Sequence, residues 1–463
     1  MSLDVIVVGL GAAGSATLHQ LARRGARVLG IDRHHPPHDQ GSSHGESRVT
    51  RQAIGEGDDY VPLARRSHEL WREMEAQTGE RLMLTTGGLF IGAPGLGGQH
   101  PGKTDFVRRT IEVAARHGIA HEVLTAGETR RRFPQFNPRD DEIAYFEPGA
   151  GLLYPERCIA AQLALARRLG ADVRTGEVVL NIASDAAGVR VTTDQAVYDA
   201  GEVVVAAGAW SAGLLGGAWD RSLRLYRQVM HWFEPSDPAA FAPGRFPVFM
   251  WMHGSGAEDW FYGLPVVPGS HGVKVSMERF TAPAATPDRI DRTVTGDEAL
   301  VMHRRHVADR LKDLGETWLR SVACLYTLAP ESRFLIGRDP ARERTIVVSA
   351  CSGHGFKHSP AIGEAVALSP WTAPRRRRWR RSIRPEPWRS HGDTRSAGVP
   401  PAALRHPPAG GTPALRFNLR WQPRPFAVSR PRREQAPARE SRDSSSTAFA
   451  GRPGKPWPPG SPR

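Results

Sequence analysis

The sequence contains few cysteines and no long apolar run. Only three of its 463 residues are cysteine, which argues against a disulfide framework and is typical of a reducing compartment. No run of about 18 apolar residues occurs, and no charged and apolar leader precedes the first strand-like segment. We therefore expect a cytoplasmic protein that does not span a membrane, and we predict no metal site.

The positive charge of the chain is concentrated in its last part. The formal net charge is +14, a value that on its own would indicate a nucleic-acid-binding protein. Residues 369–463 contain 20 Arg and 1 Lys against 5 Asp plus Glu, whereas the preceding 368 residues carry a net charge of −2. The main part of the chain is therefore nearly neutral. Any binding of nucleic acid is expected to be non-specific and to reside in the tail.

The same tail lacks apolar periodicity. Residues 369–463 hold 18 of the 38 prolines, and residues 375–378 are all arginine. Such a segment cannot bury enough apolar surface to offset the entropy cost of ordering it, so we predict that it is disordered. Its Arg, Pro, Gly and Ala content is typical of a reading-frame shift in a GC-rich gene. We favour that interpretation over an evolved nucleic-acid-binding tail.

The beginning of the chain carries the most specific local pattern. Residues 3–8 form a short β-branched run that suits a buried strand, and the motif Gly-x-Gly-x-x-Gly follows at residues 9–14. A helix is expected over residues 12–24 and a second strand over residues 27–32. This order of strand, glycine turn, helix and strand predicts a dinucleotide-binding unit.

Each residue of this motif has a physical role. Gly9 permits the tight turn, Gly11 lets the backbone approach a pyrophosphate, and Gly14 lets the helix pack closely on the strand. Asp32 ends the second strand, where a carboxylate accepts hydrogen bonds from ribose hydroxyls. The same motif serves in NAD-dependent dehydrogenases and, at its weakest, is only a tight turn. The long loop after Asp32 weakens the NAD interpretation.

A second glycine-rich turn follows another buried strand late in the chain. Residues 345–350 are β-branched and small, Gly353 and Gly355 follow, and a helix is expected over residues 360–368. A glycine turn before a helix N-terminus makes an anion or carbonyl site from backbone amides. Two such turns in one chain indicate one large cofactor that is held from both ends.

The middle of the chain has a different composition. Aromatic and β-branched residues cluster between residues 223 and 280, which is typical of an antiparallel sheet with one face against an apolar pocket. Lys274 lies in the strand-like segment 272–277, where an inward orientation would be costly without a function and an outward one needs no explanation. Before this region, residues 197–199 and 202–210 are predicted to form two separate strands.

These elements predict an α/β fold with an α+β second domain. We expect a Rossmann-type FAD-binding domain, an antiparallel-sheet substrate domain and the disordered tail. The first domain comprises residues 1–80, 145–220 and 320–368, and the second comprises residues 81–144 and 221–319.

Several motifs, in one order, resemble those of the flavin-dependent amine oxidases typified by monomeric sarcosine oxidase and N-methyl-L-tryptophan oxidase. They include Gly-Ser-Ser-His-Gly-Glu-Ser-Arg at residues 41–48, Cys-Leu-Tyr-Thr at 324–327 and Ser-Gly-His-Gly-Phe-Lys at 352–357. The likeness extends over residues 3–368. It implies an FAD enzyme, a monomer, that oxidises an N-methyl amino acid with O₂ to give hydrogen peroxide.

The resemblance also implies roles for individual residues. Cys324 would carry a covalent flavin link, Lys274 would stabilise superoxide, and Arg51 with Lys357 would hold the substrate carboxylate. His44 and Arg48 would lie near the flavin, and Tyr262 and Tyr326 would line the pocket. The full set of cofactor-binding residues implied is Gly9, Gly11, Gly14, Asp32, Arg33, Ser42, Cys324, Gly353, Gly355 and Lys357.

The chain departs from the family at a few positions. Glu278 stands where sarcosine oxidase has a histidine in the substrate pocket, and residues 51–54 read Arg-Gln-Ala-Ile instead of Arg-His-Ala-Tyr. Glu278 would either bind a cationic or hydrogen-bond-donating side chain of the substrate or face solvent. Alternatives are therefore oxidation of a cyclic secondary amine such as pipecolate, or a dehydrogenase with another electron acceptor. The altered tail adds a third, an inactive flavin- or nucleic-acid-binding protein.

Overall fold

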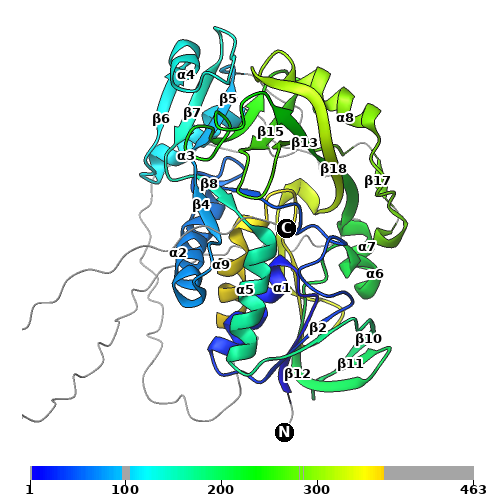
Figure 1. The fold of residues 1–463 in the computed structure, drawn as a ribbon. Coiled ribbons are helices and arrows are strands. Elements are labelled where there is room, and N and C mark those ends of the chain that lie inside the picture. Colours follow the sequence, from blue (N-terminus) through cyan, green and yellow to red (C-terminus); the bar gives the residue numbers. More distant parts are fainter. Residues whose placement is uncertain (1–2, 96–104, 281, 285, 370–463) are drawn as a thin grey trace, which may run out of the picture. The chain divides into compact units, whose positions relative to one another are not determined.

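The computed structural model describes residues 3–95, 105–280, 282–284 and 286–369 (Figure 1). These residues all belong to one compact unit. Apart from Ser369, the segment that we predict to be disordered, residues 369–463, lies outside the described residues. Within the described part of the chain, no helix is long and apolar enough to cross a bilayer.

The first sheet is built on the predicted dinucleotide-binding unit. Strands β1 and β2 are parallel neighbours, and α1 (Ala12–Arg23) connects them. The parallel part of the sheet has the order β9-β2-β1-β12-β20, and three further strands pair antiparallel at its edges. Its strands are β1 (Leu3–Val8), β2 (Val28–Asp32), β9 (Asp172–Thr175), β10 (Val179–Ser184), β11 (Val189–Thr193), β12 (Val197–Val205), β19 (Leu335–Arg338) and β20 (Thr345–Ser349).

The sequence prediction needs one correction in this sheet. Residues 197–199 and 202–210 do not form two strands, because β12 runs without a break from Val197 to Val205. Its first half pairs antiparallel with β11 and its second half pairs parallel with β1 and β20. β12 therefore belongs both to the antiparallel edge formed with β11 and β10 and to the parallel part of the sheet. Its first half contains polar residues and its second half is apolar, and this difference led to the prediction of two strands.

Helices α1, α5 (Pro155–Arg168) and α9 (Ser359–Leu368) pack together beside this sheet (Figure 1). The contact between α1 and α9 is close, because a Cβ at Gly363 would lie 2.5 Å from the Ala16 carbonyl carbon. Apolar residues of the two helices join those of β1 in one core cluster. The predicted helices over residues 12–24 and 360–368 are confirmed, with the first ending at Arg23.

The second sheet covers the aromatic region of the sequence. Its order is β17-β13-β16-β15-β14-β5-β7-β6, with β18 paired to β13. The predicted antiparallel pairing holds except between β5 and β14, which are parallel. Its strands are β5 (Gly88–Gly92), β6 (Glu122–Thr125), β7 (Ile143–Glu147), β13 (Arg224–Pro235), β14 (Val248–Met252), β15 (Trp260–Leu264), β16 (Val273–Ser276), β17 (Pro283–Ala284) and β18 (Leu314–Leu328).

A small third sheet carries one of the candidate arginines. Strand β8 (Gly151–Leu153) pairs antiparallel with β3 (Arg48–Thr50) on one side and with β4 (Met83–Thr85) on the other. The remaining α-helices are α2 (Val61–Thr78), α3 (Phe106–Arg116), α4 (Ala126–Arg132), α6 (Ser211–Leu215), α7 (Ala218–Ser222) and α8 (Gly296–Met302). Thr125 and Glu128 form a capping box at the start of α4.

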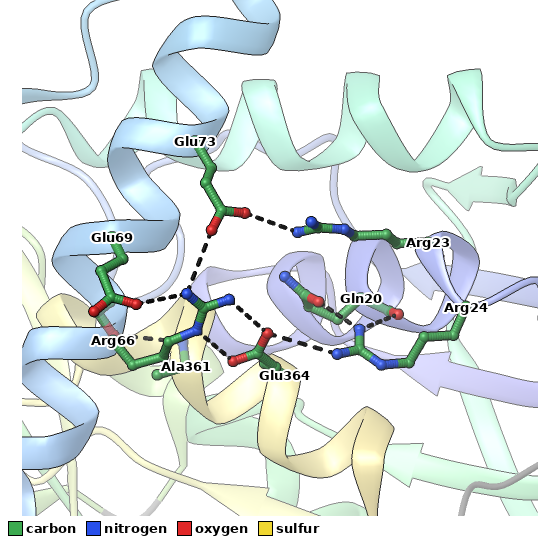
Figure 2. Close-up of polar contacts among 9 residues, drawn as sticks. Gln20, Arg23, Arg24, Arg66, Glu69, Glu73, Ala361 and Glu364 are labelled. Atoms are coloured by element: carbon green, nitrogen blue, oxygen red, sulfur yellow. Dashed lines mark hydrogen bonds and ion pairs between the residues drawn. The ribbon is translucent and has the colours of Figure 1, made fainter. Parts of the chain in front are cut away.

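Charged side chains join the three helices α1, α2 and α9 (Figure 2). Arg66 of α2 donates to both carboxylate oxygens of Glu364 on α9, at 2.7 and 2.9 Å. Arg24 of α1 lies 3.6 Å from the same carboxylate. Glu69 and Glu73 of α2 also pair with Arg66. Burial opposes ionisation of Glu364, but the hydrogen bonds from Arg66 prevail and lower the pKa of its carboxyl.

Substituting Glu364→Gln is expected to lower the free energy of unfolding at pH 7 by about 2 kcal/mol, because two partly buried arginines lose their shared anion. A carboxylate whose pKa is lowered by folding stabilises the protein above its unfolded pKa, and this contribution is lost as the pH falls through the folded pKa. The difference between the variant and the wild type should therefore shrink below about pH 4.5. Denaturant unfolding at several pH values measures it.

The matched control for this variant is Glu69→Gln, which removes the exposed partner of the same arginine. An exposed pair contributes at most about 1 kcal/mol, so the control should unfold close to the wild type. Equal unfolding of the two variants would contradict the assigned role of Glu364.

Candidate functional site

One cavity of about 550 Å³ extends along both glycine-rich turns and reaches the second sheet. Gly9 and Gly11 border it from the first turn, and Gly353 and Gly355 border it from the second. Met250, Trp260, Tyr262 and Tyr326 contribute its aromatic and apolar wall. The two turns that the sequence places more than 300 residues apart therefore share one site, as predicted.

The first turn has the shape that a bound pyrophosphate requires. Gly9 has a φ of +86°, and a Cβ there would lie 2.6 Å from the Ala207 Cα. A Cβ at Gly14 would lie 1.7 Å from the Gly9 carbonyl oxygen, so α1 begins directly against the turn. Gly11 is different, because nothing lies within 4 Å of its Cβ position and it borders the cavity. The amide end of α1 therefore faces open space, where an anion fits.

Asp32 is placed at the end of β2 and borders the cavity. One carboxylate oxygen accepts the Leu10 N–H at 2.6 Å and the other accepts the His34 N–H at 2.8 Å. Each oxygen of an ionised carboxylate accepts more than one hydrogen bond, so capacity remains for ribose hydroxyls. The two amide bonds fix the carboxylate beside the glycine turn.

Arg33 follows Asp32 and also borders the cavity. Its guanidinium lies 5.1 Å from the ring centroid of Trp210 and 3.5 Å from the Asp288 carboxylate. The Trp210 Nε1 donates to Asp288 at 3.0 Å. These three residues border the cavity, as does Asp32. Ser42, on the loop that follows β2, borders the cavity as well.

The second turn also requires glycine, because a Cβ at Gly353 or Gly355 would overlap neighbouring atoms. Gly353 has a φ of +79°, and a Cβ there would lie 2.7 Å from Oε1 of Glu278. A Cβ at Gly355 would lie 1.4 Å from the Ala350 carbonyl oxygen. The turn is therefore closed against β20, and its first glycine makes room for the Glu278 carboxylate. Taken together, the open turn at Gly11, the fixed carboxylate of Asp32 and this second turn fit a large dinucleotide.

Arg51 is a buried cation at the cavity wall. It is 1 % exposed, and its Nη2 donates to both oxygens of Glu56 at 2.9 and 2.7 Å. Its guanidinium also lies 5.3 Å from the ring centroids of Phe90 and Phe106. The buried Nε has no hydrogen-bond partner among the described residues. Glu56 was missed in the sequence, although its spacing of five residues from Arg51 allows the pair.

Lys357 and Glu278 add one basic and one acidic side chain to the cavity. Both are 5 % exposed and both border it. The Nζ of Lys357 donates to the His354 carbonyl oxygen at 2.8 Å. The prediction that Glu278 either faces a ligand or faces solvent is resolved in favour of a buried position at the cavity.

Two tyrosines line the same end of the cavity, as the resemblance implies. Burial raises the pKa of Tyr262 and raises that of Tyr326 well above its ordinary value. Both phenols are therefore neutral near pH 7. A neutral phenol donates one hydrogen bond and provides an apolar ring to a ligand.

Arg48 borders the cavity, whereas His44 does not. Arg48 donates to the carbonyl oxygens of Ser47 and Ser42 at 2.9 and 2.8 Å. Burial, together with the Arg48 charge, lowers the pKa of His44 to about 3. His44 is therefore a neutral buried side chain behind the wall.

Lys274 is directed inward from β16, which decides between the two orientations left open by the sequence. It is 2 % exposed, and its Nζ donates to the Gly45 carbonyl at 3.0 Å and to the Ser47 carbonyl. Burial, and then the nearby Arg48 charge, lower its pKa well below the ordinary value. Lys274 is not among the residues that border the cavity. It lies behind the cavity wall, against residues 45–47, which precede Arg48.

Two cysteines lie close to this region. Cys324 on β18 is 1 % exposed and packs with Met230, Trp232 and Tyr326. Burial raises the pKa of its thiol to about 11. Cys351, which follows β20, packs against the same cluster and borders the cavity. The resemblance implies a covalent flavin link at Cys324, whereas the cysteine that borders the cavity in the structure is Cys351.

The family comparison agrees with this site. The profile of the FAD dependent oxidoreductase family, DAO, matches residues 4–368. Over 368 residues the chain is 41% identical to a monomeric sarcosine oxidase of Streptomyces avermitilis, covering 79% of this chain and 92% of that one. Over 371 residues it is 33% identical to an N-methyl-L-tryptophan oxidase of Yersinia pestis, covering 80% of this chain and 95% of that one.

A solved structure gives the same result for the fold. NikD, described as an unusual amino acid oxidase essential for nikkomycin biosynthesis, is 27% identical with a TM-score of 0.69. The match covers 79% of this chain and 93% of NikD. With the glycine turns, Asp32 and the cavity that joins them, these likenesses settle the family: the chain belongs to the FAD dependent oxidoreductases, and FAD is its cofactor.

Proposed function

We propose that the protein is an oxidase of secondary N-methyl amino acids, which converts the C–N bond to an imine and reduces O₂ to hydrogen peroxide. Water then hydrolyses the imine. The observation that carries this proposal is that one cavity joins the glycine turns to two buried cations, Arg51 and Lys357. The names of the relatives, sarcosine oxidase and N-methyl-L-tryptophan oxidase, support the substrate class.

FAD, when bound, accepts two electrons from the substrate C–N bond and passes them to oxygen. The residues proposed to hold it are the glycines of the two turns, Asp32, Arg33 and Ser42, which border the cavity. Gly14 contributes through the packing of α1 on the turn.

Arg51 and Lys357 are proposed to bind the substrate carboxylate. The Nε of Arg51 is buried and has no partner among the described residues, so one strong donor is available. A carboxylate that approaches Arg51 competes with Glu56, which holds the Nη2 group. Binding the carboxylate orients the rest of the amino acid in the cavity, where Tyr262 and Tyr326 exclude water.

The side chain of the substrate is proposed to lie beside Glu278. A buried carboxylate favours a cationic or hydrogen-bond-donating group and disfavours an apolar one. Glu278 therefore disfavours the alternative substrate, a cyclic secondary amine such as pipecolate, because that substrate presents only methylenes at this position.

Lys274 is proposed to favour reaction with oxygen. Reduction of O₂ creates a negative charge, and a nearby buried cation stabilises that charge more strongly than an exposed one. Its buried Nζ donates to the carbonyl oxygens of Gly45 and Ser47 and lies 5.7 Å from the ring centroid of Trp232. The proposal distinguishes an oxidase from a dehydrogenase with another electron acceptor.

A covalent flavin link through Cys324 is also proposed, on the resemblance of the Cys-Leu-Tyr-Thr motif. Acid precipitation of the loaded protein tests it, because covalently held flavin stays in the pellet. Release of the flavin from wild-type protein would contradict the link, and release from a Cys351→Ser variant alone would move the link to the cysteine at the cavity surface.

The domain boundaries given above, a monomeric state and a cytoplasmic location stay predictions. We propose the FAD-binding and substrate domains as the working division of the chain. Monomer formation is supported by the name of the relative from Streptomyces avermitilis. A single peak at the monomer mass in light scattering would agree with it, and a dimer mass would contradict it.

Full-length protein loaded with FAD should form one hydrogen peroxide per imine with sarcosine or N-methyl-L-tryptophan. The Lys274→Met variant should react with oxygen about 100-fold more slowly, because the cation is lost. Reduction of the flavin by substrate should change much less. Oxygen consumption and stopped-flow absorbance measure the two steps separately, and Lys312→Met, an exposed lysine, is the matched control.

Other results would select the alternatives. Turnover with pipecolate but with neither N-methyl amino acid would favour the cyclic amine oxidase. Turnover with a dye but not with oxygen would favour the dehydrogenase. Failure to bind FAD, together with salt-dependent binding of DNA, would favour the inactive protein with a basic tail.

A further inference from the structure

Residues 45–53 form the segment that carries both cavity arginines, Arg48 and Arg51. Its middle is strand β3, which pairs antiparallel with β8 so that Arg48 lies opposite Leu153 and Thr50 opposite Gly151. The partner segment begins at the end of β7 and continues through β8 to the start of α5. Two acidic residues, Glu147 and Glu156, stand at the two ends of that partner segment.

Glu147 binds the backbone just after Arg51. Its two carboxylate oxygens accept the N–H groups of Gln52 at 2.7 Å and Ala53 at 3.2 Å. The Tyr145 hydroxyl donates to the same carboxylate at 2.9 Å. Glu147 is 1 % exposed. Burial of an acidic side chain is costly, so three converging donors indicate a specific task for this one.

Glu156 does the same at the other end. One of its oxygens accepts the consecutive N–H groups of Gly45 at 2.7 Å and Glu46 at 3.1 Å. The arginine segment is therefore fixed at three places, by a carboxylate at each end and by the strand pairing between them. Both ends of the segment are held in the same way, by a carboxylate that accepts two consecutive backbone N–H groups. This repetition supports a positioning role in addition to the burial of Glu147.

Ala53 connects Glu147 to the guanidinium of Arg51. Its N–H donates to Glu147, and its carbonyl oxygen accepts from Nη1 of Arg51. The orientation of this one residue therefore links the buried acid to the buried cation. Glu147 does not border the cavity, so any effect on a ligand passes through Arg51.

We infer that Glu147 is a positioning residue for substrate binding: it fixes the turn after β3 so that the Arg51 guanidinium meets the substrate carboxylate. The inference rests on the proposed function, in which Arg51 binds that carboxylate. A carboxylate suits this task better than an amide, because it only accepts hydrogen bonds and can therefore take both backbone N–H groups and the phenol. An amide at this position directs its NH₂ group at one of these donors.

The test compares Glu147→Gln with Glu142→Gln in full-length, FAD-loaded protein. Glu142 is a matched control because it is also buried, at 2 % exposure, and directly precedes the other end of β7. It accepts from the Arg139 backbone and the Trp251 indole, away from the arginine segment. The ligand is butanoate, the all-carbon isostere of N-methylglycine, which has no C–N bond to oxidise. Its Kd is measured by calorimetry, together with KM and kcat for sarcosine.

We expect Glu147→Gln to raise the butanoate Kd and the sarcosine KM about tenfold, with kcat changed less than about twofold. Glu142→Gln should leave all three close to wild type. If Glu147→Gln folds poorly, Tyr145→Phe removes one of the three hydrogen bonds and should raise the Kd about threefold. A purely structural role for Glu147 would lower thermal stability and leave the KM unchanged in the folded fraction.

The outcomes separate this inference from the proposed function. Wild-type protein that oxidises sarcosine, with Glu147→Gln and Glu142→Gln indistinguishable in Kd and KM, would overturn the role of Glu147 alone. Wild-type protein that binds neither sarcosine nor butanoate would overturn the proposed function, and the inference with it.

Discussion

Gly11→Leu is expected to abolish FAD binding while leaving the fold intact. Nothing lies within 4 Å of the Cβ position of Gly11, and its φ of −68° is one that any residue adopts. The protein itself therefore tolerates a side chain there. That side chain projects from the amide end of α1 into the cavity, where the pyrophosphate of the cofactor has to approach the backbone. Flavin content and thermal unfolding of the purified variant measure the two effects.

Two other glycines are controls for this prediction. Gly315→Leu introduces the same side chain at another position with nothing within 4 Å, in the exposed first part of β18, and should keep wild-type flavin content. Gly14→Ala should instead destabilise the protein even without cofactor, because its Cβ would lie 1.7 Å from the Gly9 carbonyl oxygen. Full flavin content in Gly11→Leu would show that the turn at residues 9–14 is not the phosphate site.

The second large effect is expected at Arg51. Replacing it alone would leave Glu56 without its cation in a buried position, so the Arg51→Gln/Glu56→Gln double variant is the cleaner change. It removes both charges, and glutamine matches glutamate in size although it is shorter than arginine. We expect kcat/KM for sarcosine to fall about 1,000-fold, because the variant loses both the Nε donor and the positive charge proposed to bind the substrate carboxylate.

An amine without a carboxylate shows whether that loss is specific. N-methylethylamine lacks the group that Arg51 is proposed to bind, so its slow oxidation should be nearly the same in wild type and double variant. The preference of the enzyme for sarcosine over this amine should then largely disappear. A double variant that keeps the preference would assign the carboxylate to another residue, with Lys357 the first to examine.

The cofactor end of the site could be predicted from the sequence because its determinants are local. Gly9, Gly11 and Gly14 lie within six residues, and β1, α1 and β2 follow from short-range patterns of apolar residues and glycine. Asp32 could be identified because its distance along the chain from the glycines is fixed by one helix. The second turn at Gly353 and Gly355 was predictable for the same reason.

The pairing of charges could not be predicted in this way. Glu364 contacts Arg66 across 298 residues of sequence, and Lys274 contacts Gly45 across 229. Residues 273–276 alternate Val, Lys, Val and Ser, a pattern that does not reveal that all four positions of β16 are buried in the folded chain. Such pairings depend on how the sheets and helices pack, which local patterns do not specify.

Glu147 and Glu156 illustrate a local signal whose partner is set by the fold. Each acidic residue stands at a boundary of a secondary-structure element, Glu147 at the end of β7 and Glu156 in the first turn of α5. An acid at such a boundary is a signal for a backbone amide that needs an acceptor. The identity of that backbone, residues 45–46 and 52–53, becomes visible only in the folded chain.

One measurement tests the central claim most directly. Full-length protein, loaded with FAD and mixed with sarcosine or N-methyl-L-tryptophan without oxygen, should lose the visible absorbance of oxidised flavin. Admission of air should restore it and release one hydrogen peroxide per flavin. Loaded protein whose absorbance does not change with either amino acid would contradict the assignment of this chain as an oxidase of N-methyl amino acids.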